Sequence, residues 1–173
     1  MKKLQGSMSS DSVKKLSEKI IVRSLKLQEV KNARSFFIYV SVKSEVQTHK
    51  LIEKLLKQGK IITVPKILEK GIMQACQIAS FDGLKSGKYD IPCPASKNFY
   101  KGKIDVGVVP GLAFTTELER LGKGGGYYDK FIAENSEIFT IGLAFESQIV
   151  PYIPTIKDDQ LVDMVVTERR VIN

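Results

Sequence analysis

Histidine, cysteine and tryptophan are scarce in this sequence of 173 residues, which has one histidine (His49), two cysteines and no tryptophan. A site built from several histidines is therefore excluded, and a histidine-based catalytic triad would have to use His49. The cysteines, Cys76 and Cys93, do not form a Cys-x-x-Cys motif, so we expect neither a zinc site nor a disulfide framework. Two thiols in a reducing compartment are the simpler expectation.

Long hydrophobic runs are also missing. No apolar stretch approaches the length of a bilayer span, and the first residues are basic and polar. We therefore expect a cytoplasmic protein without a membrane segment. The hydrophobic share of 43% and the charged share of 27% are typical of globular proteins. We expect residues 1–173 to form a single domain, of which 1–10 are mobile.

Positive charge is in excess, because 27 lysine and arginine residues oppose 19 acidic residues and give a net charge of +8. A basic surface suits nucleic acids, anionic membranes or polyanionic small molecules, but a lysine-rich solvated surface has the same composition. A basic nucleic-acid-binding module is therefore one alternative, and its affinity would fall steeply with salt. No patch of lysines interleaved with aromatic residues supports it, so we expect no nucleic-acid partner.

Apolar residues recur with helical spacing over 11–27, where Ser9, Ser10 or Asp11 is suited to cap the helix. A second helix is expected after Thr48, a suitable cap, and ends at Gly59. Apolar runs predict strands at 35–42, 60–64, 72–80, 104–109, 139–145 and 162–172. We expect Pro65 to end the second strand and 81–98 to be a long loop with a lid or binding role.

The first two strands and the helix between them form a βαβ unit, whose strands are almost always parallel. Such units build layered domains in which helices cover the faces of the sheet. We therefore expect an α/β fold, a three-layer α/β/α domain with a mostly parallel central sheet. Its ligands would bind beyond the carboxyl ends of the strands.

The most informative stretch is 109–129, VPGLAFTTELERLGKGGGYYD, which begins at the end of a buried strand. Its glycines allow backbone N–H groups to converge on an anion, while Arg120 and Lys123 add positive charge. A helix over 127–134 would direct its N-terminus at the same anion. Asp129 is an oxygen ligand suited to Mg²⁺ carried by a nucleotide. Together these features predict a nucleotide-phosphate site at the carboxyl end of a strand.

Each feature also has a plainer explanation when it is taken alone. The glycines suit a flexible surface turn, the two cations suit solvent, and Asp129 favours the helix dipole. The stretch is not a Walker A loop, because no Gly-Lys-Ser/Thr closes it. It is not a dinucleotide fingerprint either, because Tyr127 stands where the last glycine is needed.

The pattern Arg-Leu-Gly-x-Gly-x-Gly-Tyr-Tyr-Asp at 120–129, after Val-Pro-Gly-Leu-Ala-Phe at 109–114, resembles the signature of the 5-formyltetrahydrofolate cyclo-ligases. Further motifs follow the same order over roughly 13–172. The resemblance implies ATP-dependent conversion of 5-formyltetrahydrofolate to 5,10-methenyltetrahydrofolate, with release of ADP and phosphate. It also implies ATP and Mg²⁺ as cofactors, a folate substrate that carries one or several glutamates, and a monomer.

The same resemblance implies roles for individual residues. ATP would contact Lys2 or Lys3 and the central stretch, namely Arg120, Leu121, Gly122, Lys123, Gly124, Gly125, Gly126, Tyr127 and Tyr128. The folate would contact Val40 and Glu45, the latter in Glu45-Val-Gln-Thr48, together with Lys123, Gly124, Gly125, Gly126 and Tyr127. The catalytic candidates are Arg120, Lys123 and Tyr127. Mg²⁺ would be held by Asp129 and Asp159, with Asp158 competing for the second place.

Two of these assignments have plainer alternatives in the sequence. The family's N-terminal lysine is followed four residues later by an arginine, but neither Lys2 nor Lys3 has such a partner. These lysines are equally well explained as a solvated tail. Glu45, without the resemblance, would be an exposed loop acid. A family member that binds ATP and folate without turnover is therefore a second alternative.

Overall fold

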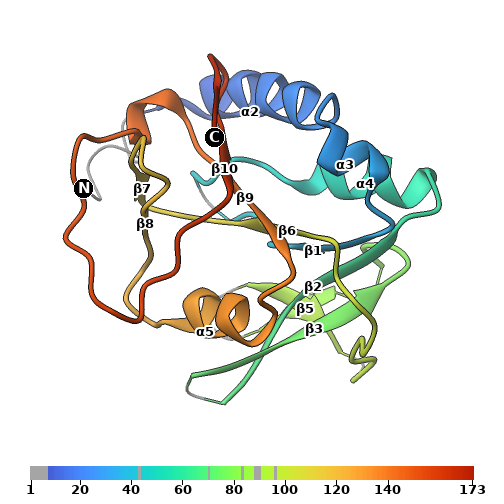
Figure 1. The fold of residues 1–173 in the computed structure, drawn as a ribbon. Coiled ribbons are helices and arrows are strands. Elements are labelled where there is room, and N and C mark those ends of the chain that lie inside the picture. Colours follow the sequence, from blue (N-terminus) through green and yellow to red (C-terminus); the bar gives the residue numbers. More distant parts are fainter. Residues whose placement is uncertain (1–7, 43, 70, 83, 88–90, 96) are drawn as a thin grey trace.

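The computed structural model describes residues 8–42, 44–69, 71–82, 84–87, 91–95 and 97–173, and its centre is a seven-stranded sheet (Figure 1). The strand order is β11-β10-β9-β6-β1-β2-β3. Neighbours from β10 to β2 are parallel, whereas β3 and β11 join the two edges antiparallel. The strands are β1 Ser35–Ile38, β2 Ile61–Glu69, β3 Ile72–Ile78, β6 Val106–Val109, β9 Phe139–Leu143, β10 Met164–Val166 and β11 Val171–Ile172. The predicted mostly parallel sheet is confirmed.

Helices cover both faces of this sheet, as Figure 1 shows. One face carries α2 (Ser10–Ser24), α3 (Gln28–Asn32) and α4 (His49–Lys57), and the other carries α5 (Tyr127–Glu134). Successive side chains of β1 pack against the helices on opposite faces of the sheet. Phe36 packs in the core with the first group of helices, and the ring of Phe37 stacks on that of Phe131 in α5 with their centroids 4.1 Å apart. This period of two confirms the three-layer α/β/α prediction.

The predicted helix over 11–27 is wrong at its C-terminal end. Ser9 is the N-cap, with its Oγ accepting from the backbone N–H of Ser12, and α2 then ends at Ser24. Leu27 is extended and precedes the separate helix α3. Leu25 and Leu27 still pack against the core that α2 covers, so the apolar spacing continues past the break. Periodicity alone therefore could not detect where the helix ends.

Pro65 does not end the second strand, contrary to the prediction. β2 continues to Glu69 because β3 pairs with it antiparallel, with Pro65 opposite Ala75. Pairing with β1 stops at Thr63, so on that side proline interrupts no hydrogen bond of the ladder. The described part of the predicted loop 81–98 also contains an antiparallel strand pair, β4 (Leu84–Ser86) with β5 (Pro92–Pro94).

The last predicted strand, 162–172, is two short strands, because β10 and β11 form an antiparallel pair at the sheet edge. Two further short strands, β7 (Ala113–Phe114) and β8 (Arg120–Leu121), pair outside the main sheet and project the central stretch from the end of β6. Within the described ranges, no helix is both long and apolar enough to cross a bilayer.

Candidate active site at the carboxyl ends of β1 and β6

A cavity of about 660 Å³ lies where the chain leaves β1 and β6. It is bounded by Tyr39, Val40 and Val42 after β1, and by Pro110, Gly111 and Leu112 after β6. Apart from the competing candidate Asp158, every predicted site residue that the structure describes lines it: Val40, Glu45, Arg120, Leu121, Gly122, Lys123, Gly124, Gly125, Gly126, Tyr127, Tyr128, Asp129 and Asp159. Lys2 and Lys3 lie outside the described residues. The topology therefore brings together residues from three separate parts of the sequence.

Apolar walls of this cavity were not recognised from the sequence. Pro65, Ile67 and Met73 come from the antiparallel edge pair β2–β3, and Ile91 comes from the segment before β5. The strand extension beyond Pro65 creates this wall, and the proline itself was interpreted as a strand end. Such a wall can contact the apolar part of a ligand, since binding cavities combine apolar surfaces with a few polar groups.

Residues 122–126, here called the glycine loop, lead directly into α5. Gly124 and Gly126 have φ values of +85° and +62°, which side chains with a Cβ rarely adopt. Gly126 is the N-cap of α5, and no side chain caps the helix there. The first N–H groups of α5 therefore lie at the cavity with no capping side chain, which is the arrangement that binds phosphate at helix N-termini.

Arg120 is buried beneath this loop and holds it together. Its Nη2 donates to Asp129 Oδ1 at 2.6 Å, and its Nη1 donates to the carbonyl oxygen of Pro110 at 3.3 Å. The guanidinium carbon lies 5.7 Å from the centre of the Tyr128 ring, within cation–π range. Its Nε is buried and has no hydrogen-bond partner among the described residues. Arg120 thus links the end of β6, the glycine loop and α5.

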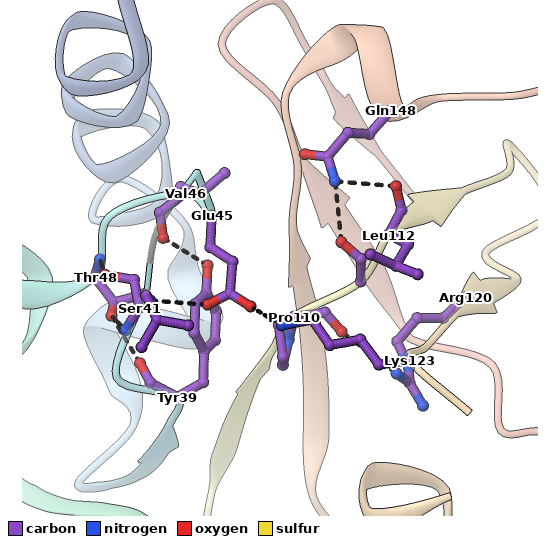
Figure 2. A network of polar contacts seen from close by, with 12 residues as sticks. Tyr39, Ser41, Glu45, Val46, Thr48, Pro110, Leu112, Arg120, Lys123 and Gln148 are labelled. Atoms are coloured by element: carbon purple, nitrogen blue, oxygen red, sulfur yellow. Dashed lines mark hydrogen bonds and ion pairs between the residues drawn. The ribbon is translucent and has the colours of Figure 1, made fainter. Parts of the chain in front are cut away.

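Gln148 fixes the turn after β6. Its Nε2 donates to the carbonyl oxygens of Gly111 and Leu112 at 2.9 and 3.2 Å (Figure 2). Its Oε1 accepts from the backbone N–H of Phe145 at 2.9 Å. Gln148 is buried, and its three hydrogen bonds connect the segment after β9 to the 111–112 turn that lines the cavity. The sequence gave no sign of this role.

The loop after β1 is tied back onto its own strand. Thr48 Oγ1 donates to the carbonyl oxygen of Tyr39 at 2.7 Å and accepts from the N–H of Ser41 at 3.1 Å (Figure 2). The prediction that Thr48 caps the next helix is therefore wrong: it stands at the N-cap position of α4, but its side chain makes no capping bond. The Tyr39 hydroxyl donates to the carbonyl oxygen of Val46 at 2.8 Å and completes the loop.

Glu45 projects from this loop to the glycine loop. Its Oε2 accepts from the N–H of Val42 at 3.0 Å, and its Oε1 accepts from Lys123 Nζ at 2.6 Å (Figure 2). Burial raises the pKa of both Tyr39 and Tyr128, and the nearby Glu45 carboxylate raises the pKa of each further. These tyrosines are therefore neutral hydrogen-bonding groups near pH 7 and do not act as bases there.

Two carboxylates line the other end of the cavity. Asp129 Oδ1, besides its bond to Arg120, accepts from the N–H of Gln160 at 3.3 Å. Asp159 Oδ2 accepts from the N–H of Ile156 at 2.8 Å, whereas Asp158 does not line the cavity. The described part of the chain holds no cluster of three or more histidine, cysteine, aspartate or glutamate side chains suited to a metal. A two-carboxylate arrangement fits Mg²⁺ that also binds phosphates and water.

The fold and the cavity define a class of protein: an α/β domain in which a glycine loop and an apolar wall line one cavity at the carboxyl edge of the sheet. The family model of the 5-formyltetrahydrofolate cyclo-ligase family matches residues 1–168. The chain belongs to the 5-formyltetrahydrofolate cyclo-ligase family, as its motifs indicated.

Individual relatives agree with this membership. The chain is 30% identical to the 5-formyltetrahydrofolate cyclo-ligase of Mus musculus over 88% of this chain and 80% of that protein. It is also 30% identical to a probable 5-formyltetrahydrofolate cyclo-ligase of Schizosaccharomyces pombe, over 96% of this chain and 91% of that protein.

Two solved structures share the fold. The NMR structure of Aquifex aeolicus 5,10-methenyltetrahydrofolate synthetase superposes with a TM-score of 0.85 at 30% identity, covering 98% of this chain and 88% of that one. A Mycoplasma pneumoniae 5,10-methenyltetrahydrofolate synthetase superposes with a TM-score of 0.77 at 19% identity, covering 96% and 93%. The second likeness supports the fold alone.

Proposed function

We propose that this protein is an ATP-dependent 5-formyltetrahydrofolate cyclo-ligase, which converts 5-formyltetrahydrofolate to 5,10-methenyltetrahydrofolate and releases ADP and phosphate. One observation carries the proposal beyond family membership. The glycine loop, suited to phosphate, and Glu45, suited to the folate, face each other in one cavity and touch through Lys123 at 2.6 Å. Transfer of a phosphoryl group between two substrates requires such a shared cavity.

The chemistry explains why a site without histidine or cysteine suffices. A formamide oxygen is a poor leaving group, so ATP first phosphorylates the formyl oxygen and ADP departs. The neighbouring folate nitrogen then attacks the formyl carbon, and phosphate leaves with that oxygen as the ring closes. Positioning and charge neutralisation dominate such phosphoryl transfer, and little acid–base catalysis is needed.

The cavity residues divide into a phosphate side and a folate side. On the phosphate side, Arg120, Lys123 and the N–H groups at 122–126 would bind and neutralise the phosphates. Glu45 would accept a hydrogen bond from the pterin, while Val40 and Tyr127 would form walls around it. In this assignment Arg120 acts from a buried, preorganised position, which suits charge stabilisation in the transition state.

Magnesium would be held by Asp129 and Asp159 together with the phosphates. It would supply neutralisation of phosphate charge when bound. The donor set fits, because both aspartates line the phosphate side of the cavity and are oxygen ligands. The bond from Arg120 to Asp129 orients that carboxylate at the end of the glycine loop. A folate substrate with one or several glutamates, the monomeric state and the cytoplasmic location remain predictions.

Absorbance tests the proposal directly. Purified protein is mixed with 5-formyltetrahydrofolate and Mg-ATP, and the methenyl chromophore is followed. Growth of the band in the presence of ATP, and its absence when ATP is omitted, is the expected result. A flat trace with folded protein that binds both substrates would refute turnover and support the alternative of a non-catalytic binder. That alternative is motivated by the missing arginine after Lys2 and Lys3.

A further inference from the structure

One ion pair joins the two loops that the proposed function assigns to different substrates. Lys123 Nζ lies 2.6 Å from Glu45 Oε1, although the two residues are 78 positions apart in the chain (Figure 2). ATP would require the Lys123 ammonium, and the folate would require the Glu45 carboxylate. Each substrate therefore has to draw its group away from the same pair.

The two partners are held with unequal firmness. The Glu45 side chain is 12% exposed and its second oxygen is occupied by the N–H of Val42. The Thr48 and Tyr39 hydrogen bonds fix the rest of its loop. The Lys123 side chain is 63% exposed and sits in the glycine loop. When the pair breaks, Lys123 is therefore the group that moves, and Glu45 stays in place as an acceptor.

We propose that the Glu45–Lys123 pair couples the two binding events, so that each substrate tightens the binding of the other. This inference rests on the proposed function. A phosphate that draws Lys123 away leaves Glu45 free to accept a hydrogen bond from the folate. The free energy needed to break the pair is then required only once when both ligands bind. Linkage requires the effect to be equal in both directions. Because Lys123 is largely exposed, we expect a coupling of about three- to tenfold.

A simpler electrostatic effect has to be separated from this coupling. Glu45 carries a negative charge near a site for polyphosphate, so its removal would improve ATP binding even without Lys123. That general repulsion acts in any background, whereas release of Lys123 from the pair requires Lys123 to be present. A double-mutant cycle therefore distinguishes the two explanations.

The experiment is calorimetric titration with Mg²⁺ and β,γ-imido-ATP, without folate. The proteins are wild type, Glu45→Gln, Lys123→Met and the double variant. We expect Glu45→Gln to bind the nucleotide about three- to tenfold more tightly than wild type, and the same substitution to give a clearly smaller gain in the Lys123→Met background, where only the general repulsion is removed. An equal gain in both backgrounds, or no gain in either, would overturn the inference. Lys103→Met is the matched control, because Lys103 pairs with Glu137 on the surface, and its nucleotide affinity should equal that of wild type.

A second titration measures the coupling itself. Wild type should bind β,γ-imido-ATP about three- to tenfold more tightly in saturating 5-formyltetrahydrofolate, and Lys123→Met should lose this difference. Equal affinities of wild type with and without folate would refute the coupling. Turnover by wild type, followed through the methenyl band, is a separate readout. An active enzyme without coupling refutes only this inference, and an inactive protein with coupling refutes only the proposed catalysis.

Discussion

Replacing Arg120 by alanine removes the group that connects three parts of the cavity. The side chain of Arg120 is 2% exposed, and its guanidinium pairs with Asp129 at 2.6 Å. In the proposed function, the same group stabilises the charge that develops on the transferred phosphate. The substitution therefore affects catalysis and stability through one side chain, and the two effects have different magnitudes.

For catalysis, loss of a preorganised charge-stabilising donor typically lowers kcat by about a hundredfold or more, or roughly 3 kcal/mol of the barrier. For stability, breaking a buried ion pair costs about 3–5 kcal/mol when a charge is left uncompensated. Asp129 would keep some contact with water and the N–H of Gln160, since its side chain is 17% exposed. We therefore expect a stability loss of about 1–3 kcal/mol, which leaves most domains of this size folded.

The assay combines methenyl absorbance kinetics with urea unfolding of the same preparations. Arg170→Ala is the control, because Arg170 pairs with Glu146 away from the cavity and is 50% exposed. Its kcat should match that of wild type. Arg120→Lys should recover less than the full activity, because an ammonium cannot reproduce the planar fork of the guanidinium. A folded Arg120→Ala variant with wild-type kcat would refute the role assigned to this arginine.

Three further predictions concern Gln148, two glycines with positive φ and Asp105. Gln148→Ala should lower kcat/KM by about tenfold, because the carbonyl oxygens of Gly111 and Leu112 lose their hydrogen bonds from Gln148 Nε2. Steady-state kinetics measures this, and an unchanged value would exclude a positioning role. Gly124→Ala and Gly59→Ala should each lower the free energy of unfolding in urea by about 1 kcal/mol, because both positions have positive φ. Only Gly124→Ala should also weaken binding of β,γ-imido-ATP in calorimetry. Burial opposes ionisation of Asp105, but the N–H groups of residues 34 and 35 and a serine hydroxyl outweigh it and lower the pKa of Asp105 below its ordinary value of 3.8. Its stabilisation is therefore complete above that value and is lost as pH falls through the lowered pKa, so Asp105→Asn should flatten the acid limb of the stability–pH curve; identical curves would contradict this.

Much of the architecture followed from local patterns. Strand 35–42 began at Ser35, and the helix at 127–134 had the predicted bounds. The order of strands and helices sufficed to predict a parallel sheet, because a βαβ connection leaves few alternatives. Glycines beside Arg120 and Lys123 marked the loop that lines the cavity, since their backbone requirements belong to the loop itself.

Two predictions were wrong because they depended on contacts with other parts of the chain. Pro65 was interpreted as a strand end because proline lacks an N–H, but β3 lies on one side of it and β1 has already ended on the other. Thr48 was interpreted as a helix cap because its residue type and position fit, but its hydroxyl donates to the carbonyl oxygen of Tyr39 instead. In both cases a neighbour from another part of the fold supplied the competing interaction.

The sequence by itself determined the layered parallel fold and the position of the glycine loop, because both depend on residues that are close in the chain. Only the tertiary structure decided that Glu45 meets Lys123, that Arg120 is occupied by Asp129, and that an antiparallel edge forms the apolar wall. The Glu45–Lys123 contact and the apolar wall join segments whose approach depends on how the strands are ordered in the sheet. Side-chain chemistry that spans two strand ends therefore becomes visible only when the whole sheet is assembled.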